Sequence, residues 1–275
     1  MEAGELLRAG RLSEALARLQ DQVRSDPANS KHRVFLFQLL CVLGQWDRAL
    51  TQLNLAAEMD PKCLLMSQVC QPAIQCEALR AEIYSGKRLP LIFGEPSEWV
   101  GWMVQAAMLT AGGKHAEAGQ LRSKALEAAP AIAGNVDGRP FEWAADADPR
   151  MGPILEAVIE GKYFWIPMSN IRTVALEAPT DLRDVVWMPA TFTWTNGGRS
   201  VGLIPTRYPG SEQSEDPAVR LARKTDWIDA GGVQLPVGQR LLATDAAEYP
   251  LMEVRQLTLG EAEPVSAPGP EGVHG

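Results

Sequence analysis

Residues that commonly carry chemistry are scarce in this chain. Only three histidines occur among 275 residues, at His32, His115 and His274. The first two fall on predicted helices and the third in a proline- and glycine-rich tail, so the sequence predicts neither a metal site nor a catalytic triad. The chain also has no Walker-type loop, no G-x-G-x-x-G after a strand, and no predicted strand-to-helix turn carrying a nucleophilic serine. These absences argue against an enzyme.

Cysteines and apolar runs are equally limited. The spacings of Cys41, Cys63, Cys70 and Cys76 fit neither the disulfide framework of a secreted protein nor the paired CxxC motifs of a zinc site, so we expect free thiols. No apolar run approaches the roughly 18–20 residues that a membrane-spanning helix needs. The N-terminal stretch MEAGELLRAGRLSEAL is acidic and amphipathic, unlike a signal peptide. We therefore expect a cytoplasmic protein with no membrane partner.

A strongly basic surface is missing as well. The net charge is −8, and residues 1–130 are neutral, with 14 Lys and Arg against 14 Asp and Glu. Residues 131–275 hold 12 basic against 20 acidic residues and carry the whole excess. Because nucleic-acid binding requires clustered positive charge, nucleic acid is not an expected partner.

What the sequence does contain is a repeat. The segment GRLSEAL at 10–16 recurs as GQWDRAL at 44–50, and Asp26–Pro27 recurs as Asp60–Pro61. Both offsets are 34 residues, the period of a tetratricopeptide (TPR) helical hairpin. A third, more degenerate copy runs from Gly113 to Pro130. The repeat predicts stacked helical hairpins over residues 1–130.

Each position that recurs between the copies of the repeat has a structural reason. Gly10, Gly44 and Gly113 fall where a tight interhelical turn favours a residue without a Cβ, and a proline ends each second helix. Residues 62–85 read as one long helix with a kink expected at Pro72, and Ser97 is a candidate N-cap for the helix that follows. Together these signals predict roughly seven helices in the first 130 residues.

A stack of such hairpins presents a concave groove lined by the first helix of each hairpin, which suits a peptide or an amphipathic helix. The alternative is a pure scaffold, in which the helices only bury one another. In the TPR register the predicted groove residues are Lys31, Val34, Gln38, Gln68 and Gln75.

The pattern changes after Pro130, where short strand-like runs replace the long helical periods. The clearest is the hairpin formed by TFTWT at 191–195, the turn residues NGG and the run at 201–204. We expect an α+β fold, with TPR-like helical repeats at 1–130, a β-rich small antiparallel sheet or half-barrel at 131–260, and a disordered tail at 261–275. Further expected elements are short helices at 154–160 and 216–224 and strands at 163–166, 171–176, 185–188 and 251–259.

Polar residues in this second half allow two interpretations. Asp146 and Asp148, with Arg150 nearby, could bind a divalent cation and support acid/base chemistry. Alternatively they cap a helix starting near Pro153 and pair with arginines. The other members of the predicted structural network, or of a second partner-binding face, are Arg183, Asp184, Arg207, Arg223, Arg240 and Asp245.

Several blocks in this half resemble one family. They are GNVDGRPFEWAADADPRMGPILEAVIEGKYFWIP, DLRDVVWMPA, GLIPTRYPGSE, RLARKTDW and GQRLLATDAAEYPLMEVR, which together cover about residues 134–259. In this order they resemble the ImpE family, also called SciE or TagJ, of bacterial type VI secretion gene clusters. The resemblance implies a cytoplasmic accessory protein that binds an amphipathic N-terminal helix of the small sheath subunit and is associated with a ClpV-type AAA+ ATPase. It implies no reaction and no cofactor.

Three functions are therefore weighed. The leading hypothesis is a non-catalytic adaptor of the type VI secretion system. The second is a divalent-metal-dependent hydrolase centred on Asp146 and Asp148. The third is a TPR co-chaperone-like module, against which the neutral charge of residues 1–130 argues, because such modules bind acidic tails through a basic groove.

Overall fold

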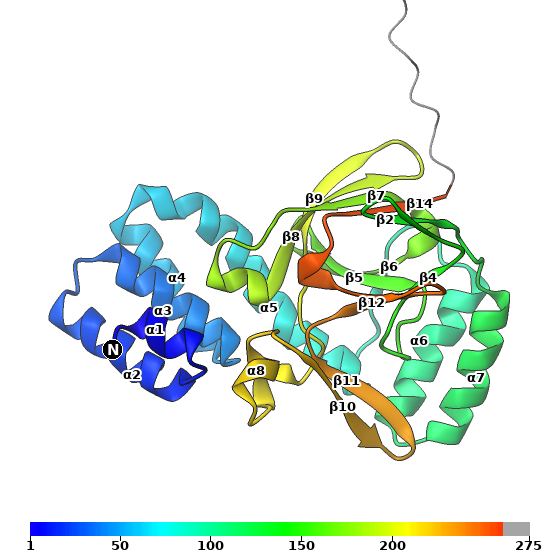
Figure 1. Cartoon of the computed structure of the whole chain (residues 1–275), viewed down its shortest axis with the longest axis horizontal. Coiled ribbons are helices and arrows are strands. Elements are labelled where there is room, and N and C mark those ends of the chain that lie inside the picture. The colour runs from blue at the N-terminus through cyan, green and yellow to red at the C-terminus, as the bar shows by residue number, and fades with distance from the viewer. Residues whose placement is uncertain (261–275) are drawn as a thin grey trace, which may run out of the picture.

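The computed structural model describes residues 1–260, and the predicted disordered tail at 261–275 lies outside the described residues. The first 128 residues are dominated by helices, as the repeat predicts, and the α+β class is confirmed (Figure 1). The helices in this part are α1 (Ala3–Arg8), α2 (Leu12–Ser25), α3 (Ser30–Val42), α4 (Trp46–Met59), α5 (Leu64–Tyr84), α6 (Glu98–Ala111) and α7 (His115–Ala128).

The glycines of the repeat form the predicted interhelical turns. Gly10, Gly44 and Gly113 have φ values of +74°, +67° and +73°, a left-handed conformation that side chains with a Cβ rarely adopt. Ala15 and Ala49, early in the second helix of their hairpins, are completely buried. Helices α3 and α4, and likewise α6 and α7, therefore pack closely as antiparallel pairs.

Helix α5 separates the third hairpin from the first two and crosses the middle of the molecule (Figure 1). It is continuous through Pro72, whose ring lies against Gly161 of the neighbouring strand turn, 3.1 Å from a Cβ built there. Ser97 precedes α6 in extended backbone, but its side chain makes no capping hydrogen bond. The position of that helix start is confirmed, whereas the predicted cap is not.

The strands within residues 1–260 form three sheets, and all of them except β1 lie in the second half. The largest has nine strands in the order β1-β6-β5-β9-β8-β7-β14-β2-β3, antiparallel except for the parallel pair β1 and β6. Its strands are β1 (Leu91–Ile92), β2 (Gly134–Val136), β3 (Arg139–Phe141), β5 (Ile154–Ile159), β6 (Lys162–Pro167), β7 (Ile171–Leu176), β8 (Trp187–Trp194), β9 (Arg199–Pro205) and β14 (Gln256–Leu259).

Two smaller sheets complete this half. One is a ribbon of β10 (Thr225–Ala230) and β11 (Val233–Gly238), and the other joins β13 (Glu248–Pro250), β12 (Leu241–Thr244) and β4 (Ala144–Asp146). The predicted hairpin at 191–204 is present as β8 and β9, paired in register from Trp187 and Pro205 to Thr193 and Arg199. The predicted strands at 163–166 and 171–176 are β6 and β7.

Several predicted elements were wrong. The segment 154–160 is strand β5, not a helix, and every residue of β5 is buried. Because both faces of this strand are covered, apolar residues point to both sides, and its sequence ILEAVI shows no alternation of apolar and polar residues. The helix expected at 216–224 is reduced to α8 (Pro217–Arg220). The run at 185–188 enters β8 only at Trp187, and the run at 251–259 begins with a 3-10 turn before β14.

Two hydrophobic clusters hold these elements together. The first joins α1 to α7 with one face of the large sheet, through residues such as Val158, Trp165 and Leu203. The second lies between the large sheet and the three-stranded sheet, and includes Phe192, Ile204 and Leu242. The first cluster continues across the predicted boundary at residue 130, and that boundary stays a prediction.

Candidate functional site

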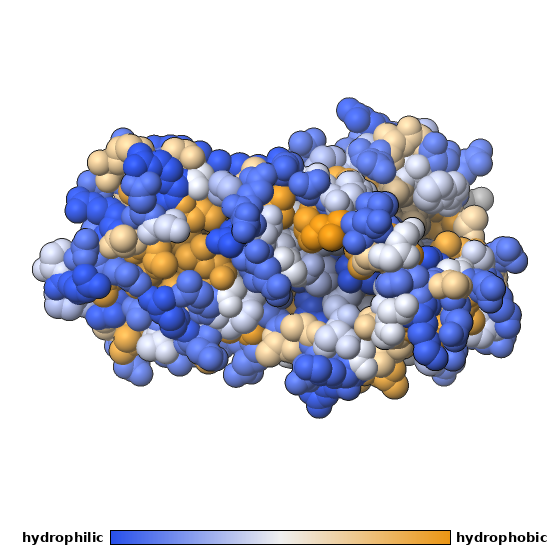
Figure 2. Space-filling view, turned by 90° about the horizontal axis from the view of Figure 1, so that it is seen from below, coloured by the Kyte–Doolittle hydropathy of each residue, from blue (hydrophilic) through white to orange (hydrophobic). Residues whose placement is uncertain are grey.

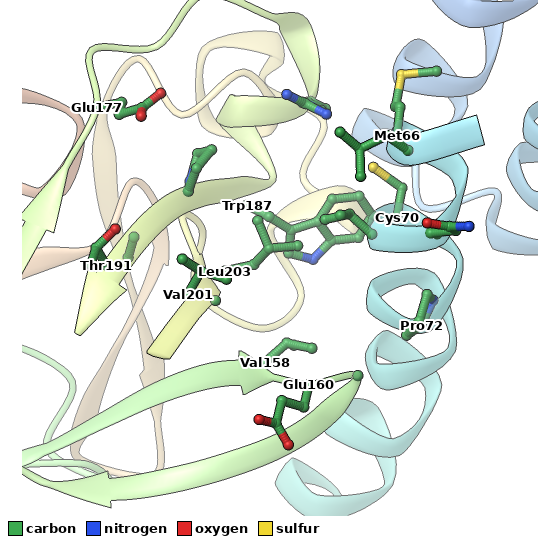
Figure 3. Close-up of a pocket in the computed structure, with 18 of the residues that line it drawn as sticks. Met66, Cys70, Pro72, Val158, Glu160, Glu177, Trp187, Thr191, Val201 and Leu203 are labelled. Carbon is green, nitrogen blue, oxygen red and sulfur yellow. The ribbon is translucent and has the colours of Figure 1, made fainter. Parts of the chain in front are cut away.

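A cavity of about 740 Å³ lies between α5 and the outer face of the large sheet (Figure 3). Leu65, Met66, Val69 and Pro72 of α5 form one wall, and Trp187 lies at the base. The floor comes from four adjacent strands, β5, β9, β8 and β7, and is lined by Val158, Ala175, Pro189, Thr191, Val201 and Leu203. We call this cavity the α5–sheet groove.

The rims of the groove expose large apolar side chains. Leu65 and Val201 are 72% and 74% exposed, and Val69 is 42% exposed. Single exposed apolar residues are common on folded proteins, and Figure 2 shows several separate hydrophobic patches on the face seen from below. The α5–sheet groove is distinguished because its apolar residues line a concave surface, which is the usual form of a binding site.

Trp187 fixes the base of the groove to the helical half. Its indole Nε1 donates to Glu77 Oε1 of α5 at 2.8 Å, and its ring lies 6.1 Å from that of Trp46 in α4. The side chain is almost completely buried. The wall and the floor of the groove are therefore held together, so the cavity is largely preformed.

Behind the groove, a buried ionic cluster joins α5 to the sheet. The Glu156 carboxylate of β5 accepts from Arg80 Nε of α5 at 2.7 Å, and also from Arg240 and from the Tyr163 hydroxyl. Burial alone would raise the pKa of Glu156, but Arg80 and Arg240 outweigh it and hold the pKa well below its ordinary value. Arg240 also pairs with Asp146. Sequence reasoning missed Arg80, Glu156 and Tyr163.

Asp146 and Asp148 are engaged with arginines and do not cap a helix. Asp146 pairs with Arg240, and Arg150 Nε donates to Asp148 Oδ1 at 2.9 Å. The expected helix near Pro153 is absent, since β5 begins there, so the capping part of the structural interpretation was wrong. Burial raises the pKa of Asp146 to about 6, although Arg240 opposes the shift. Both carboxylates are buried and held by cations, an arrangement that serves structure.

Two further predicted arginines connect the halves through backbone carbonyls. Arg207 is buried and donates to the carbonyl oxygens of Val42, at the end of α3, and of Arg220, at 2.8 and 2.5 Å. Burial lowers its pKa to about 10. Arg223 is exposed and donates to the carbonyl of Arg8, at the end of α1, at 2.9 Å. A guanidinium at a helix C-terminus satisfies free carbonyls and complements the helix dipole.

The remaining polar candidates lie apart from this cluster. Arg183 lines the α5–sheet groove and lies 3.5 Å from both Asp181 and Asp184. The Asp184 carboxylate accepts from the backbone amides of Thr180 and Asp181, which orders the turn before β8. Asp245 accepts from the backbone amide of Glu142 at 2.7 Å. The structure thus divides the predicted network into several local sites.

Of the five residues predicted to line the TPR groove, one is buried by the protein itself. Gln38 is only 5% exposed, because the 3-10 turn Leu182–Val185 packs against α3. Lys31 is exposed and Val34 half-buried near the start of α3. Gln68 and Gln75 are exposed on α5, and Gln68 lines the α5–sheet groove. Of these five residues, Gln68 is the one that lines the cavity between α5 and the sheet.

The residues around Ser200 match the letters of the G-x-S-x-G motif. Gly198-Arg199-Ser200-Val201-Gly202 lies in the hairpin between β8 and β9, not at a strand-to-helix turn. Ser200 Oγ accepts from Trp194 Nε1 at 3.1 Å. The nucleophile-elbow geometry that gives this motif its chemistry is absent at this position.

Within residues 1–260, no group of three or more His, Cys, Asp and Glu side chains is arranged to hold a metal ion. The same part of the chain contains no helix long and apolar enough to cross a membrane. All four cysteines are buried free thiols. The fold and the groove define a protein of helical TPR-like hairpins joined to a strand-rich domain, with a preformed apolar groove between helix and sheet.

Comparisons with known proteins agree with this class. Residues 6–70 match the tetratricopeptide repeat, and residues 138–258 match the family described as ImpE protein. The chain is 52% identical over 268 residues to the type VI secretion system accessory component TagJ of Pseudomonas aeruginosa PAO1, covering 97% of this chain and 93% of that protein. The chain belongs to the ImpE/TagJ family of type VI secretion accessory proteins.

The fold also has a solved counterpart. The crystal structure of protein VPA1032 from Vibrio parahaemolyticus superposes with a TM-score of 0.83 at 23% identity, covering 94% of this chain and 98% of that one. At this identity the likeness bears on the fold alone.

Proposed function

We propose that the chain is a non-catalytic, cytoplasmic adaptor of a bacterial type VI secretion system, and that its α5–sheet groove binds the amphipathic N-terminal helix of the small sheath subunit. Membership of the ImpE/TagJ family supports the setting. The observation that carries the proposal is the apolar, concave and preformed groove. The pairing of Asp146 and Asp148 with arginines supports a non-catalytic role.

The wall of the groove has the pattern of a helix-contact face. Leu65, Gln68, Val69 and Pro72 occupy positions i, i+3, i+4 and i+7 of α5 and line the cavity together. Residues at this spacing form one stripe, roughly 10 Å long, that faces an adjacent helix. An amphipathic partner helix recognised through anchors at i, i+3, i+4 and i+7 has the same length of apolar stripe.

The floor of the groove suits the same occupant. The outer faces of β8 and β9 beside α5 carry Thr191, Val201 and Leu203, so a helix laid there would contact both α5 and the sheet. Helix-on-sheet layers are a standard way to bury an apolar helix face. The contact would bury roughly 1,000 Å² in total, at the low end for a specific interface, and we expect an affinity near micromolar.

The experiment is a titration of a fluorescently labelled peptide, corresponding to the sheath-subunit helix, with the full chain. We expect saturable binding that is lost in a peptide whose apolar face is replaced by serine. Leu65→Glu and Val201→Glu should each weaken binding by at least about tenfold, because a charge then replaces an apolar contact worth about 1.4 kcal/mol or more.

The matched control is Leu89→Glu. Leu89 is 68% exposed, close to Leu65 and Val201, but it lies outside the α5–sheet groove. This variant should bind the peptide as the unmodified chain does. Absence of binding at high micromolar concentration, or equal loss in the control, contradicts the proposal.

A link to a ClpV-type AAA+ ATPase is the second part of the proposal. Its support is the family membership, not a particular surface. A pull-down of the ATPase by the full chain, with and without the sheath subunits, tests it. Retention of the ATPase in at least one arm is expected, and failure in both arms contradicts the link.

A further inference from the structure

The floor of the α5–sheet groove becomes deeper in one direction along its strands. We infer that the deepest part, around Leu203, is an anchor site that takes one large apolar side chain, aliphatic or phenyl, from the bound helix. This inference rests on the proposed function and specifies the partner further. One residue on the apolar face of the helix contributes more to binding than any other.

Side-chain exposure on the floor falls along β9. Val201 is 74% exposed, Leu203 is 9% exposed, and Pro205 is buried. Residues two apart on a strand lie on the same face of the sheet, so these three side chains form one row. The floor therefore leads from an open rim at Val201 to a closed inner end at Pro205.

The strands on both sides of β9 show the same decrease. From exposed Glu160, in the turn after β5, exposure falls to 5% at Val158 and to 0% at Glu156. On β8 it falls from half-buried Thr191 to Trp187, which is 1% exposed. The three strands therefore deepen together toward the buried ionic cluster.

Leu203 lies at the centre of this deep end. It is paired with Val158 of β5 on one side and with Pro189 of β8 on the other, and directly paired residues share a face of the sheet. Cys70 of α5, which is 1% exposed, lines the cavity from the wall and points toward Trp187 (Figure 3). Residues of α5, β5, β8 and β9 thus enclose the anchor site, and a side chain placed there is shielded from water on several sides.

Polar groups that border the anchor site are already engaged within the protein. Trp187 Nε1 donates to a glutamate of α5 at 2.8 Å, and the Glu156 carboxylate is held by two arginines. Arg183, which also lines the cavity, is ion-paired with Asp181 and Asp184. A polar side chain inserted here would lose its hydrogen bonds to water without gaining new partners, which is unfavourable. The anchor site therefore selects an aliphatic or phenyl side chain.

An alanine scan of the peptide corresponding to the sheath-subunit helix tests the anchor directly. Interfaces obtain most of their affinity from a few side chains that are desolvated in central pockets, surrounded by contacts of smaller effect. We expect alanine at one apolar position of the peptide to weaken binding to the full chain by about 30-fold, which corresponds to an interface hot spot. Alanine at each other apolar position should cost clearly less.

Filling the anchor site from the protein side locates the anchor. Leu203→Trp should weaken binding of the unmodified peptide by a similar factor, about 30-fold, because the larger ring occupies the site. In this variant, alanine at the anchor position of the peptide should cost no more than about threefold further, since the two changes remove the same contact. Leu89→Trp, at a position that is 68% exposed and outside the groove, is the matched control and should leave binding unchanged.

Enlarging the anchor site supplies a second readout. Compared with the unmodified chain, Leu203→Ala should shift the preference by about tenfold toward a peptide with a bulkier apolar side chain at the anchor position, the effect expected of a methylene or two in an apolar pocket. This variant removes atoms, so it also tests the site if Leu203→Trp is unable to fold.

The outcomes separate the two proposals. Losses spread evenly over the apolar face of the peptide, a folded Leu203→Trp chain that binds as its control does, or an unchanged preference in Leu203→Ala overturn the anchor site while leaving helix binding intact. Absence of binding between the unmodified peptide and the unmodified chain would instead remove the proposed function on which the anchor site rests.

Discussion

Glu156→Gln tests whether the buried ionic cluster holds the helical half on the sheet. The substitution keeps the shape of the side chain and removes its charge. Glu156 is completely buried and accepts from Arg80 Nε and Nη2 at 2.7 and 3.1 Å, as well as from Arg240 and Tyr163. A glutamine at this position leaves two buried guanidinium groups with a single neutral oxygen between them.

The expected loss follows from the partners that remain. Breaking a buried ion pair by removing one member costs about 3–5 kcal/mol. Arg80 still donates to the carbonyl oxygen of Arg207 at 2.8 Å, and Arg240 still pairs with Asp146. We therefore expect the lower end of that range, about 3 kcal/mol, which corresponds to a decrease in Tm of roughly 6–12 °C.

The assay is chemical and thermal unfolding of the full chain. The control is Glu14→Gln, which breaks a salt bridge with Arg11 whose side chains are about half exposed, and which should leave Tm nearly unchanged because exposed pairs contribute little. If Glu156→Gln destabilises the chain no more than this control does, the reasoning about the buried cluster is refuted.

Three other changes have defined outcomes. Gly202→Ala should lower stability by about 1–3 kcal/mol in denaturant unfolding, because a Cβ there would lie 2.6 Å from Ile159 Cδ1 and 2.7 Å from the carbonyl oxygen of Val158; unchanged stability would contradict this. Burial raises the pKa of Asp146 to about 6, so the folded state binds that proton more tightly than the unfolded chain, and its contribution to the unfolding free energy falls as pH rises from about 4 to 6. Asp146→Asn should remove this part of the pH dependence, and an unaltered pH profile would count against it. Arg207→Met should increase amide hydrogen exchange at the end of α3, since the buried carbonyls of Cys41 and Val42 lose their donor. Exchange equal to that of the unmodified chain would show that these hydrogen bonds do not stabilise the end of α3.

The helical half was predictable because its constraints are local. The period of 34 residues, the glycines at the turns and the prolines after the second helices each act within a few residues of their own position. The long helix at 62–85 was also predictable and is present as α5, while the kink expected at Pro72 stays a prediction. What the repeat did not indicate is that the 3-10 turn at 182–185 covers α3, because that contact joins residues far apart in sequence.

The sheet was predictable only where its strands alternate or meet at a recognisable turn. The hairpin of β8 and β9 has both signals. Strand β5 has neither, because it is buried on both faces, and the segment was predicted as a helix. The ribbon of β10 and β11 was missed, although Gly231–Gly232 marks its turn.

Some polar residues of the site were predictable from the sequence, but the location of the groove was not. Pairing with arginines was one of two interpretations of Asp146 and Asp148, and both are paired with arginines in the structure. Gln68 was predicted to line the TPR groove and instead lines the α5–sheet groove. Glu156 was not recognised, because a single glutamate in a predicted short helix gives no sign of burial. The groove itself forms only where α5 packs beside four strands, and no local sequence pattern predicts that contact.

The most direct measurement of the central claim is a crystal structure of the full chain with the peptide corresponding to the sheath-subunit helix. The account predicts helical density in the α5–sheet groove, with apolar side chains against Leu65, Val69 and Val201. Density for the peptide on any other surface, with this groove left open, would contradict it.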